Sequence, residues 1–345
     1  MMKNKIGFIA VGQAGGNLGS ALEKNGYNVL FINTSTEDLD TLTKVKFKYH
    51  IKGGEGCNKD RNKAKELVVE DFEQLANEIN QKVPENFIYV IFSSGGGTGS
   101  GASPMLIDLL VQHMDKKVGA ITIIPSENEP LKTHINSYEC FRELADIEMA
   151  STIVLDNNAY KNKMIINQEF IKAFELMMDM PNHKDVRGNI DKAEVMEMIE
   201  TRGMLTINKV EKSESTLAKL VERLKNNIYA PMETDQVIKY IGLLLARQID
   251  ISELKKEVGN YLDAFQGYND EYTLCVLSGL SLPFTRLLDM KEKVVASQET
   301  IKKNLTATGI NKLSDDIDFL SGHTTPAKPI KASSATDIFA KYRKK

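Results

Sequence analysis

Apolar and polar residues alternate along the first half of the chain in two distinct periods. Short, nearly continuous apolar runs predict buried strands, and longer runs with an apolar residue every three or four positions predict amphipathic helices. Strands are expected at residues 5–11, 28–33, 87–92, 118–125 and 152–156, and helices near residues 16–25, 58–82, 103–114 and 131–149. This alternation predicts an α/β fold in which helices cover both faces of a parallel sheet and ligands bind at the carboxyl ends of the strands.

The pattern changes in the second half of the chain. A helix is expected at residues 167–180, followed by a polar turn and a short helix that starts near Asp191. Helices and strands mix from Gly203 to about Ser281, with strand candidates at residues 205–207, 241–246 and 272–278. We therefore expect a second, mixed-sheet α/β domain after a connecting helix.

A long helix is expected past Pro283. Its apolar residues recur at seven-residue spacing, with further apolar residues beside them. They are Leu287, Val294 and Ile301, accompanied by Leu288, Val295 and Leu305. A helix with one such stripe either packs on its own domain or docks on a neighbouring subunit.

Composition and charge limit the function classes. The chain has 345 residues, 42% of them hydrophobic and 26% charged, as expected of a soluble protein of about two domains. A formal net charge of -3 gives no overall basic field, so any DNA contact should be local or indirect and no direct sequence-specific DNA binding is expected. The cysteines Cys57, Cys140 and Cys275 are far apart and show no CxxC spacing, which favours neither a disulfide framework nor a zinc site. No signal peptide or membrane span is recognised, so we expect a cytoplasmic protein.

A glycine-rich segment follows the third expected strand. It consists of Gly95, Gly96, Gly97, Thr98, Gly99, Ser100 and Gly101. Glycine lets the backbone approach an anion closely, and the helix that follows adds the positive end of its dipole. Thr98 and Ser100 can add hydroxyl donors. The alternative is a flexible linker, but a linker seldom lies between a buried strand and an amphipathic helix. The segment therefore predicts a phosphate site, and hence a bound nucleotide.

A second glycine turn follows the first expected strand. It reads Gly12, Gln13, Ala14, Gly15, Gly16 and Asn17. Dinucleotide-binding domains use GxGxxG and an acidic residue about 20 positions later, whereas this chain has GxxGGxxG and places Asn33 at that position. The chain also contains no GxxxxGK[ST] motif. The commonest nucleotide-binding folds therefore do not explain the two glycine turns.

The segment GGGTGSG resembles the signature of the tubulin and FtsZ superfamily, and the order of the other segments is similar to that family across about residues 5–305. The resemblance implies that several loops converge on one GTP, which binds with Mg²⁺. Besides the two glycine turns, the matching loop residues are Asn33, Thr34, Gly53, Gly54, Glu55, Gly56, Pro125 and Glu127.

Two asparagines match the guanine-reading positions of the family. Asn157 lies in the segment that resembles the guanine-recognition loop, and Asn167 matches the second base-reading position. Asparagine amides can pair with the guanine edge. The alternative for Asn157 is an ordinary turn after a strand, where asparagine is common.

The segment from Asn189 to Glu194 resembles the family's NxDxxD or NxDxxE synergy loop. Asp191 and Glu194, three positions apart on the opening turn of a helix, share a face and can position one water. The resemblance places them at the far end of the domain from the phosphates, so they would act as catalytic residues on the GTP of the next subunit in a head-to-tail filament. The alternative is that they cap the helix and compensate its dipole.

Departures from FtsZ and eukaryotic tubulin point to the TubZ group of plasmid and phage tubulins. Cys57, Asn58, Lys59 and Asp60 stand in the third loop where FtsZ has a short loop of Ala, Gly and Asn, and residues 181–188 are unusually polar. By this resemblance, residues 1–164 form the GTP-binding domain, 165–190 the central helix and connecting turn, and 191–282 a GTPase-activating second domain. The long helix occupies residues 283–308, and residues 309–345 form a flexible tail with a basic end.

The tail combines Phe339 and Tyr342 with Lys341, Arg343, Lys344 and Lys345. It resembles the adaptor-binding terminal peptides of the family and would engage a small DNA-binding adaptor at a centromere-like site; the alternative is a solvated charged end. The sequence thus favours a self-assembling GTPase whose filaments move or position plasmid or phage DNA. An FtsZ-like cell-division scaffold and an NAD-dependent dehydrogenase are the alternatives.

Overall fold

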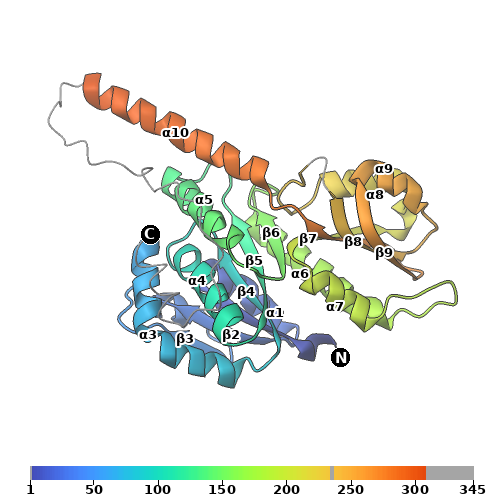
Figure 1. Ribbon diagram of the computed structural model, residues 1–345, viewed down its shortest axis with the longest axis horizontal. Coiled ribbons are helices and arrows are strands. Elements are labelled where there is room, and N and C mark those ends of the chain that lie inside the picture. The colour runs from blue at the N-terminus through green and yellow to red at the C-terminus, as the bar shows by residue number, and fades with distance from the viewer. Residues whose placement is uncertain (1, 234–236, 308–345) are drawn as a thin grey trace.

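The computed structural model describes residues 2–233 and 237–307, with only the backbone for residues 301–307. The expected tail therefore lies outside the described residues. Within them, ten strands form one sheet in the order β3-β2-β1-β4-β5-β6-β7-β10-β8-β9 (Figure 1). The strands are β1 (Ile6–Val11), β2 (Asn28–Asn33), β3 (Phe47–His50), β4 (Phe87–Ser93), β5 (Lys117–Ile124), β6 (Ser151–Asp156), β7 (Gly203–Glu211), β8 (Val237–Leu245), β9 (Asn260–Tyr268) and β10 (Tyr272–Leu280).

The sheet has a parallel part and a mixed part, as the sequence predicts. Strands β3, β2, β1, β4, β5 and β6 pair in parallel. The two parts join where the beginning of β6 pairs with the beginning of β7, through Ser151–Gly203 and Thr152–Met204. Beyond that junction, β10 runs antiparallel to both β7 and β8, and β9 is parallel to β8. The mixed part of the sheet is therefore continuous with the parallel part through one short pairing.

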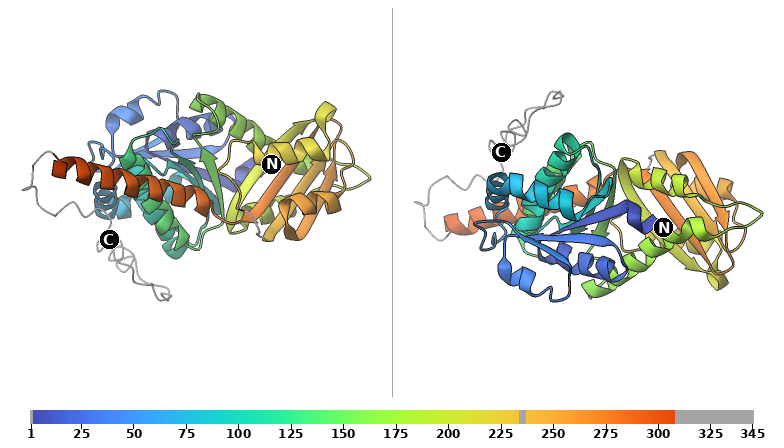
Figure 2. Two further views of the ribbon diagram at one scale, coloured as in Figure 1. Left: turned by 90° about the horizontal axis from the view of Figure 1, so that it is seen from above. Right: turned by 90° about the horizontal axis from the view of Figure 1, so that it is seen from below.

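Helices cover both faces of this sheet. The described helices are η1 (Met2–Lys5), α1 (Gly12–Lys24), α2 (Thr36–Asp40), α3 (Arg61–Lys82), α4 (Thr98–His113), α5 (Leu131–Ala145), α6 (Lys163–Asp179), η2 (Met180–Asn182), α7 (Lys192–Glu200), η3 (Lys212–Glu214), α8 (Leu217–Lys225), α9 (Ile251–Val258) and α10 (Phe284–Ala307). Buried side chains of α3, α4, α5, α8, α9 and α10 pack on one face, and those of α1, α6 and α7 on the other. Figure 2 shows the parallel part and the mixed part at opposite ends of the molecule. No helix of the described residues is both long and apolar enough to cross a membrane.

Three helices begin about one turn earlier than the sequence pattern predicts. Helix α1 starts at Gly12 instead of residue 16, and α4 starts at Thr98 instead of residue 103, so in both cases the glycine turn itself forms the first helical turn. The sequence pattern places both glycine turns before the helix, although glycine is tolerated in a first turn, whose N–H groups have no partner within the helix. Helix α6 starts at Lys163 instead of residue 167 because the Asn162 side chain caps it, accepting a hydrogen bond from the Met164 N–H at 3.0 Å. Helix α5 ends at Ala145 rather than residue 149.

Helix α10 lies beside α5 (Figure 1). Leu287 and Met290 are buried in the chain's own core and Val294 is also buried, whereas Leu288 is 52% exposed. The first half of the apolar stripe therefore packs on its own domain. The side chains of Ile301 and Leu305, which continue the stripe, lie outside the described residues.

Candidate functional site

The loops that follow the parallel strands meet at one edge of the sheet. Because β1, β2, β4, β5 and β6 run in the same direction, their carboxyl ends share that edge. All of the expected nucleotide-binding residues lie in the segments that directly follow these strands or β3, except Asn33, which is the last residue of β2, and Asn167. The structure thus brings together loops that are up to 145 positions apart in the sequence, from Gly12 to Asn157.

The glycine-rich segment supplies backbone donors at this edge. Gly97 is the N-cap residue of α4, and Thr98 begins the helix, whose first N–H groups have no partner within the helix. The Thr98 hydroxyl lies 2.7 Å from the Thr34 hydroxyl, and the Ser100 hydroxyl donates to the carbonyl of Gly96. Both hydroxyls expected to contact phosphate are engaged within the protein. The structure therefore favours backbone N–H groups as the anion donors, with Thr34 and Thr98 linking two loops.

The loop after β3 packs against the loop after β2. A Cβ on Gly54 would lie 2.6 Å from the carbonyl oxygen of Thr34, so only glycine permits this approach. Gly53 and Gly56 have φ angles of 74° and 80°, which favour glycine. Glu55 is exposed between them. The glycines therefore shape the loop, and Glu55 is the residue of this segment that presents a charge to solvent.

Helix α5 supplies a buried amide that sequence reasoning missed. Asn136 Nδ2 donates to the carbonyl oxygens of Gly96 and Lys59, both at 3.0 Å. The residue is only 5% exposed. It ties the glycine-rich loop to the loop after β3. An asparagine on the apolar face of an amphipathic helix is the sequence signal that could have revealed it, because a buried amide needs partners.

A buried cluster of charged side chains also contacts the glycine-rich segment. Arg61 donates to the Ser100 carbonyl at 3.1 Å and to Glu143 at 2.7 Å, and Glu143 also accepts from Lys65 at 2.6 Å. Burial lowers the pKa of Lys65, and the neighbouring carboxylate opposes that shift. The cluster connects the beginnings of α3 and α4 to α5.

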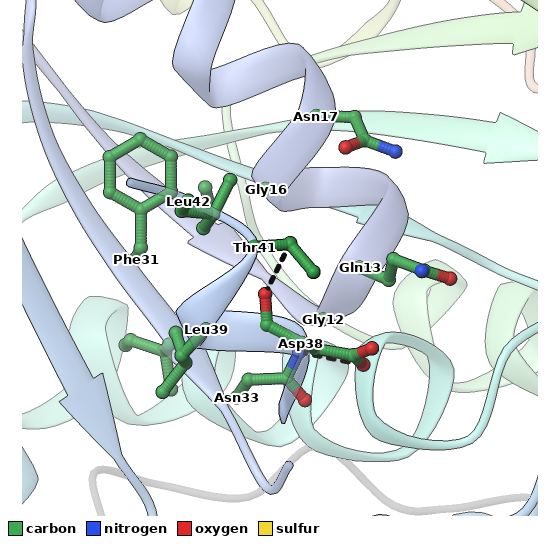
Figure 3. A pocket seen from close by; sticks show the side chains of 12 residues that line it. Gly12, Gln13, Gly16, Asn17, Phe31, Asn33, Asp38, Leu39, Thr41 and Leu42 are labelled. Carbon is green, nitrogen blue, oxygen red and sulfur yellow. Dashed lines mark hydrogen bonds between the residues drawn. The ribbon is translucent and has the colours of Figure 1, made fainter. Parts of the chain in front are cut away.

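A narrow pocket lies between α1 and the segment after β2 (Figure 3). Gly12, Gln13, Gly16, Asn17, Phe31, Asn33, Asp38, Leu39, Thr41 and Leu42 are among its lining residues. Asn33 does not point its amide to solvent: Nδ2 donates to Asp38 at 3.1 Å, and Oδ1 accepts from the Ser35 N–H at 3.3 Å. Gln13 and Asn17 are the exposed polar residues of the α1 side. Asn33 therefore orders the loop, and Gln13 and Asn17 are free to meet a ligand.

The loops after β5 and β6 are joined to α10. The Arg286 guanidinium donates to the carbonyl oxygen of Pro125 at 3.0 Å and to the Asp156 carboxylate at 3.3 Å, in a pair whose side chains are each 7% exposed. Lys293 donates to the carbonyl of Glu127. Burial raises the pKa of Asp156, against a backbone N–H and the guanidinium that favour its charged form. Helix α10 thus holds two of the loops at the candidate site.

The two predicted base-reading asparagines lie on neighbouring elements. Asn157 donates its amide to Glu129 at 3.1 Å, and Glu129 also accepts from Lys163 at 2.8 Å. Burial would raise the pKa of Glu129, but the hydrogen bonds from Lys163, from a backbone N–H and from Asn157 hold it below its usual value. Asn167 lies half-buried in the second turn of α6. The end of β6 and the beginning of α6 are thereby brought to the same edge.

Asp191 and Glu194 form the capping box of α7. The Asp191 carboxylate accepts from the N–H groups of Ala193 at 2.7 Å and Glu194 at 2.9 Å, and Glu194 accepts from the Asp191 N–H at 2.7 Å. The capping alternative is therefore present in the structure. Each carboxylate still has one oxygen with no hydrogen bond to any described residue, and Asp191 is exposed. Capping fixes the two side chains on one surface without using all of their acceptors.

This capping box lies far from the glycine-rich loop. Glu200, at the end of α7, pairs with Lys117 at the beginning of β5 at 2.5 Å, whereas the candidate nucleotide loops follow the ends of the strands. In Figure 1 the chain between α6 and α7 reaches the right-hand edge of the molecule, while α3 and α4 lie on the left. The eight residues of β5 alone span about 25 Å. The two sets of predicted site residues are therefore at opposite ends of the molecule.

Comparisons with known proteins agree with this arrangement. Residues 5–164 match the Tubulin/FtsZ family, GTPase domain. A tubulin-like protein TubZ from Clostridium botulinum C phage is 29% identical over 360 residues, which cover 99% of this chain and 100% of the relative. The structure of a tail-truncated TubZ from Clostridium botulinum phage c-st superposes with a TM-score of 0.80 at 29% identity, covering 87% of this chain and 100% of that chain.

A more distant structure shares the fold. It is a GTPγS-form protofilament of Bacillus thuringiensis serovar israelensis TubZ, with a TM-score of 0.76 at 16% identity, and covers 86% of this chain and 94% of that chain. The mixed ten-stranded sheet, the glycine-rich loop at its edge and the full-length similarity to a phage TubZ together show a TubZ-like chain whose residues 5–164 match the GTPase domain of the tubulin/FtsZ family.

Proposed function

We propose that this protein is a GTPase that polymerises head to tail and completes its active site only at the junction between two subunits. One observation carries the proposal: the loops that would hold GTP and the acidic pair that would activate water lie at opposite ends of the same molecule. The acidic pair of a subunit therefore cannot reach the nucleotide bound to that same subunit. In a head-to-tail stack, the pair of one subunit can contact the nucleotide of the next, and such a heterologous contact extends into a filament. The match of residues 5–164 to a GTPase domain argues against the alternative of an NAD-dependent dehydrogenase.

The residues divide into two groups by role. The backbone N–H groups around Gly97 and the side chains Gln13 and Asn17 would hold the phosphates, and Asn157 and Asn167 would read the guanine edge. In the next subunit, the free carboxylate oxygens of Asp191 and Glu194 would orient the attacking water. The role of Asp191 and Glu194 depends on the one oxygen of each carboxylate that is not used in the helix cap.

Magnesium would enter with the triphosphate. Among the residues that the structure describes, no cluster of three or more His, Cys, Asp or Glu side chains could hold a metal ion. Mg²⁺ commonly retains several waters and binds through substrate phosphates with few protein ligands. The ion would help neutralise the charge on the phosphates.

We further propose that the filaments move or position plasmid or phage DNA through a small DNA-binding adaptor. The full-length relative is a phage TubZ. The net charge of -3 argues against direct binding to DNA by the filament. The basic end of the tail, which lies outside the described residues, is the proposed adaptor site. An FtsZ-like scaffold would instead require a partner at the membrane. A pull-down of the DNA-binding adaptor with the full chain and with the chain truncated at residue 308 separates the two functions, because only the DNA-positioning function predicts adaptor binding that is lost on truncation.

The polymerisation proposal is tested by sedimentation with GTP and Mg²⁺. We expect pelleting above a critical concentration with GTP and little pelleting with GDP. The variants Asp191→Asn and Glu194→Gln should bind GTP normally, turn it over at least about 100-fold more slowly and leave filaments that persist. They are preferable to alanine because both new side chains preserve the cap, which alanine would lose at a cost of about 1 kcal/mol. A protein that stays monomeric with GTP, or variants that release phosphate at the normal rate, would contradict the proposal.

A further inference from the structure

The loop between β3 and α3 packs Lys59 against the glycine-rich loop. A Cβ on Gly97 would lie 2.9 Å from the amide nitrogen of Lys59 and 3.0 Å from its Cα. The Lys59 carbonyl oxygen is held by Asn136, which also binds the Gly96 carbonyl. Lys59 is thus built into the wall of the candidate phosphate site. It is also one of the residues by which this loop departs from the short loop of FtsZ.

The ammonium group of Lys59 lies over the same loop. Nζ donates to the Thr133 hydroxyl at 2.8 Å, and a Cβ on Gly95 would lie 2.3 Å from Cγ2 of that threonine. Lys59 forms no ion pair with any residue in the described part of the chain. Lys59 is a half-buried residue, and its ammonium group, whose protein partner is a neutral hydroxyl, lacks a counter-charge. A phosphate oxygen is the kind of acceptor that would supply one.

The backbone of Asn58 and Lys59 has an unusual conformation. Their φ angles are 43° and 60°, in the left-handed region that residues other than glycine seldom adopt. Hydrogen bonds keep this conformation in place: Lys132 donates to the Asn58 carbonyl at 3.4 Å, and the Asp60 N–H donates to the Cys57 carbonyl at 2.7 Å. Strain of this kind is retained where the surroundings impose it, and it is concentrated at ligand clamps. Here it directs one cation to the phosphate loop.

We propose that Lys59 is the counter-charge for the terminal phosphate of the bound triphosphate and thereby sets the preference for GTP over GDP. The inference rests on the proposed function. When the triphosphate binds, the ammonium exchanges the Thr133 hydroxyl for an oxygen of the terminal phosphate, and no covalent bond forms or breaks. The lysine supplies from the third loop a charge that P-loop proteins supply from their glycine loop, a motif this sequence lacks.

The test is a comparison of nucleotide affinities. Titration calorimetry with GDP and with slowly hydrolysed GTPγS, each with Mg²⁺ and below the concentration at which the protein pellets, is carried out on wild type, Lys59→Met and Lys59→Arg. Methionine retains the stem and the left-handed backbone cost but removes the charge. Lys63→Met is the matched control, because Lys63 is an exposed lysine four positions away in the first turn of α3. Thermal melting without nucleotide confirms that each variant is folded.

We expect Lys59→Met to weaken GTPγS binding by about tenfold or more and GDP binding by less than about threefold, since a charge-assisted contact is lost only with the triphosphate. Lys59→Arg should recover most of the affinity, and Lys63→Met should change neither value. Equal losses for both nucleotides, or no loss, would overturn the inference while leaving the proposed function intact. If wild type binds neither nucleotide, the proposed function itself fails.

Discussion

At the scale of single residues, two adjacent glycines of the phosphate loop differ in what surrounds them. A Cβ on Gly97 would meet the Lys59 amide nitrogen at 2.9 Å and Cys57 Cβ at 3.0 Å, whereas on Gly96 the nearest atom is the Ser93 carbonyl oxygen at 4.0 Å. Gly97→Ala should therefore lower the free energy of unfolding by about 1–3 kcal/mol, because the loop after β3 must move. Gly96→Ala should change it by less than about 0.5 kcal/mol.

Urea denaturation of the two glycine variants measures this difference directly. Both changes add one methyl group to the same loop, and the alanine at position 97 adds a capping cost of its own because Gly97 is the N-cap residue of α4. Equal stability would mean that the third loop is not packed against the glycine-rich loop. That result would also weaken the geometric basis for Lys59 as a phosphate ligand.

The buried pair of Asp156 and Arg286 yields a second prediction. Arg286→Met leaves a buried carboxylate without its cation and should lower the free energy of unfolding by about 3–5 kcal/mol at neutral pH. The double variant Asp156→Asn with Arg286→Met should recover a large part of that loss, because no unpaired charge remains. Denaturant melts of both single variants and the double variant form the required cycle. A double variant no more stable than Arg286→Met would show that packing, and not charge, explains the loss.

The same pair has a defined pH dependence. Burial raises the pKa of Asp156 in the folded protein, so the folded state binds this proton more tightly than the unfolded state. The contribution of the Asp156 carboxyl to the free energy of unfolding therefore increases as the pH falls through its pKa in the folded protein. Loss of the guanidinium raises that pKa further, so the cost of Arg286→Met should shrink between neutral pH and about pH 5. A cost that is constant over this range would contradict the assignment.

Single residues also show what the sequence could not provide. The motif predicts Thr98 and Ser100 as hydroxyl donors to phosphate, but it does not reveal that these hydroxyls also bond Thr34 and the Gly96 carbonyl. Hydrogen bonds between residues 64 positions apart depend on how the loops pack, which a local pattern does not encode. For the same reason Asn136, which lies outside every motif, was missed although it joins two loops of the site.

At the scale of elements, the five strands expected in the parallel part were predicted to within one residue at each end, because each is a short apolar run bounded by turn residues. Strand β9 was not expected, because Leu262 in it is 71% exposed and the strand has β8 as its neighbour in the sheet and no strand on its other side. The short edge strand β3 and the short helix α2 were also not expected, and α8 and α9 were not assigned although both are amphipathic. Elements buried on one side only therefore account for most of what the sequence did not reveal.

Helix α10 offers a prediction at the same scale. Leu287→Ala should lower the free energy of unfolding by about 2–4 kcal/mol, because this side chain is 5% exposed and packed in the core. Leu288→Ala, one position along and 52% exposed, should cost less than about 1 kcal/mol. Thermal melts of monomeric protein without nucleotide separate the two. If Leu288→Ala instead impairs pelleting with GTP while the monomer stays stable, the exposed side of α10 contacts a neighbouring subunit.

At the scale of the whole molecule, the distance between the two halves of the site is the property on which the function depends. Sequence resemblance implied that separation, and the Lys117–Glu200 pair supports it, since the end of α7 lies where β5 begins. The position of Asp191 as a helix cap was an alternative explanation, but a cap and a catalytic acid are compatible when one oxygen remains free. The remaining question is whether the pair acts across a junction.

Mixing two inactive variants answers that question. Asp191→Asn retains an intact nucleotide site, and Thr98→Ala, which loses the bond between the loops after β2 and β4, retains an intact acidic pair. Neither protein alone should turn over GTP at an appreciable rate. In an equimolar random filament, about one junction in four would pair the intact site of one variant with the intact acids of the other. Phosphate release by the mixture should therefore reach about a quarter of the wild-type rate, provided that Thr98→Ala co-pellets with its partner. A mixture that co-pellets but remains inactive would mean that each subunit must supply both halves of the reaction centre, and the shared active site would be wrong.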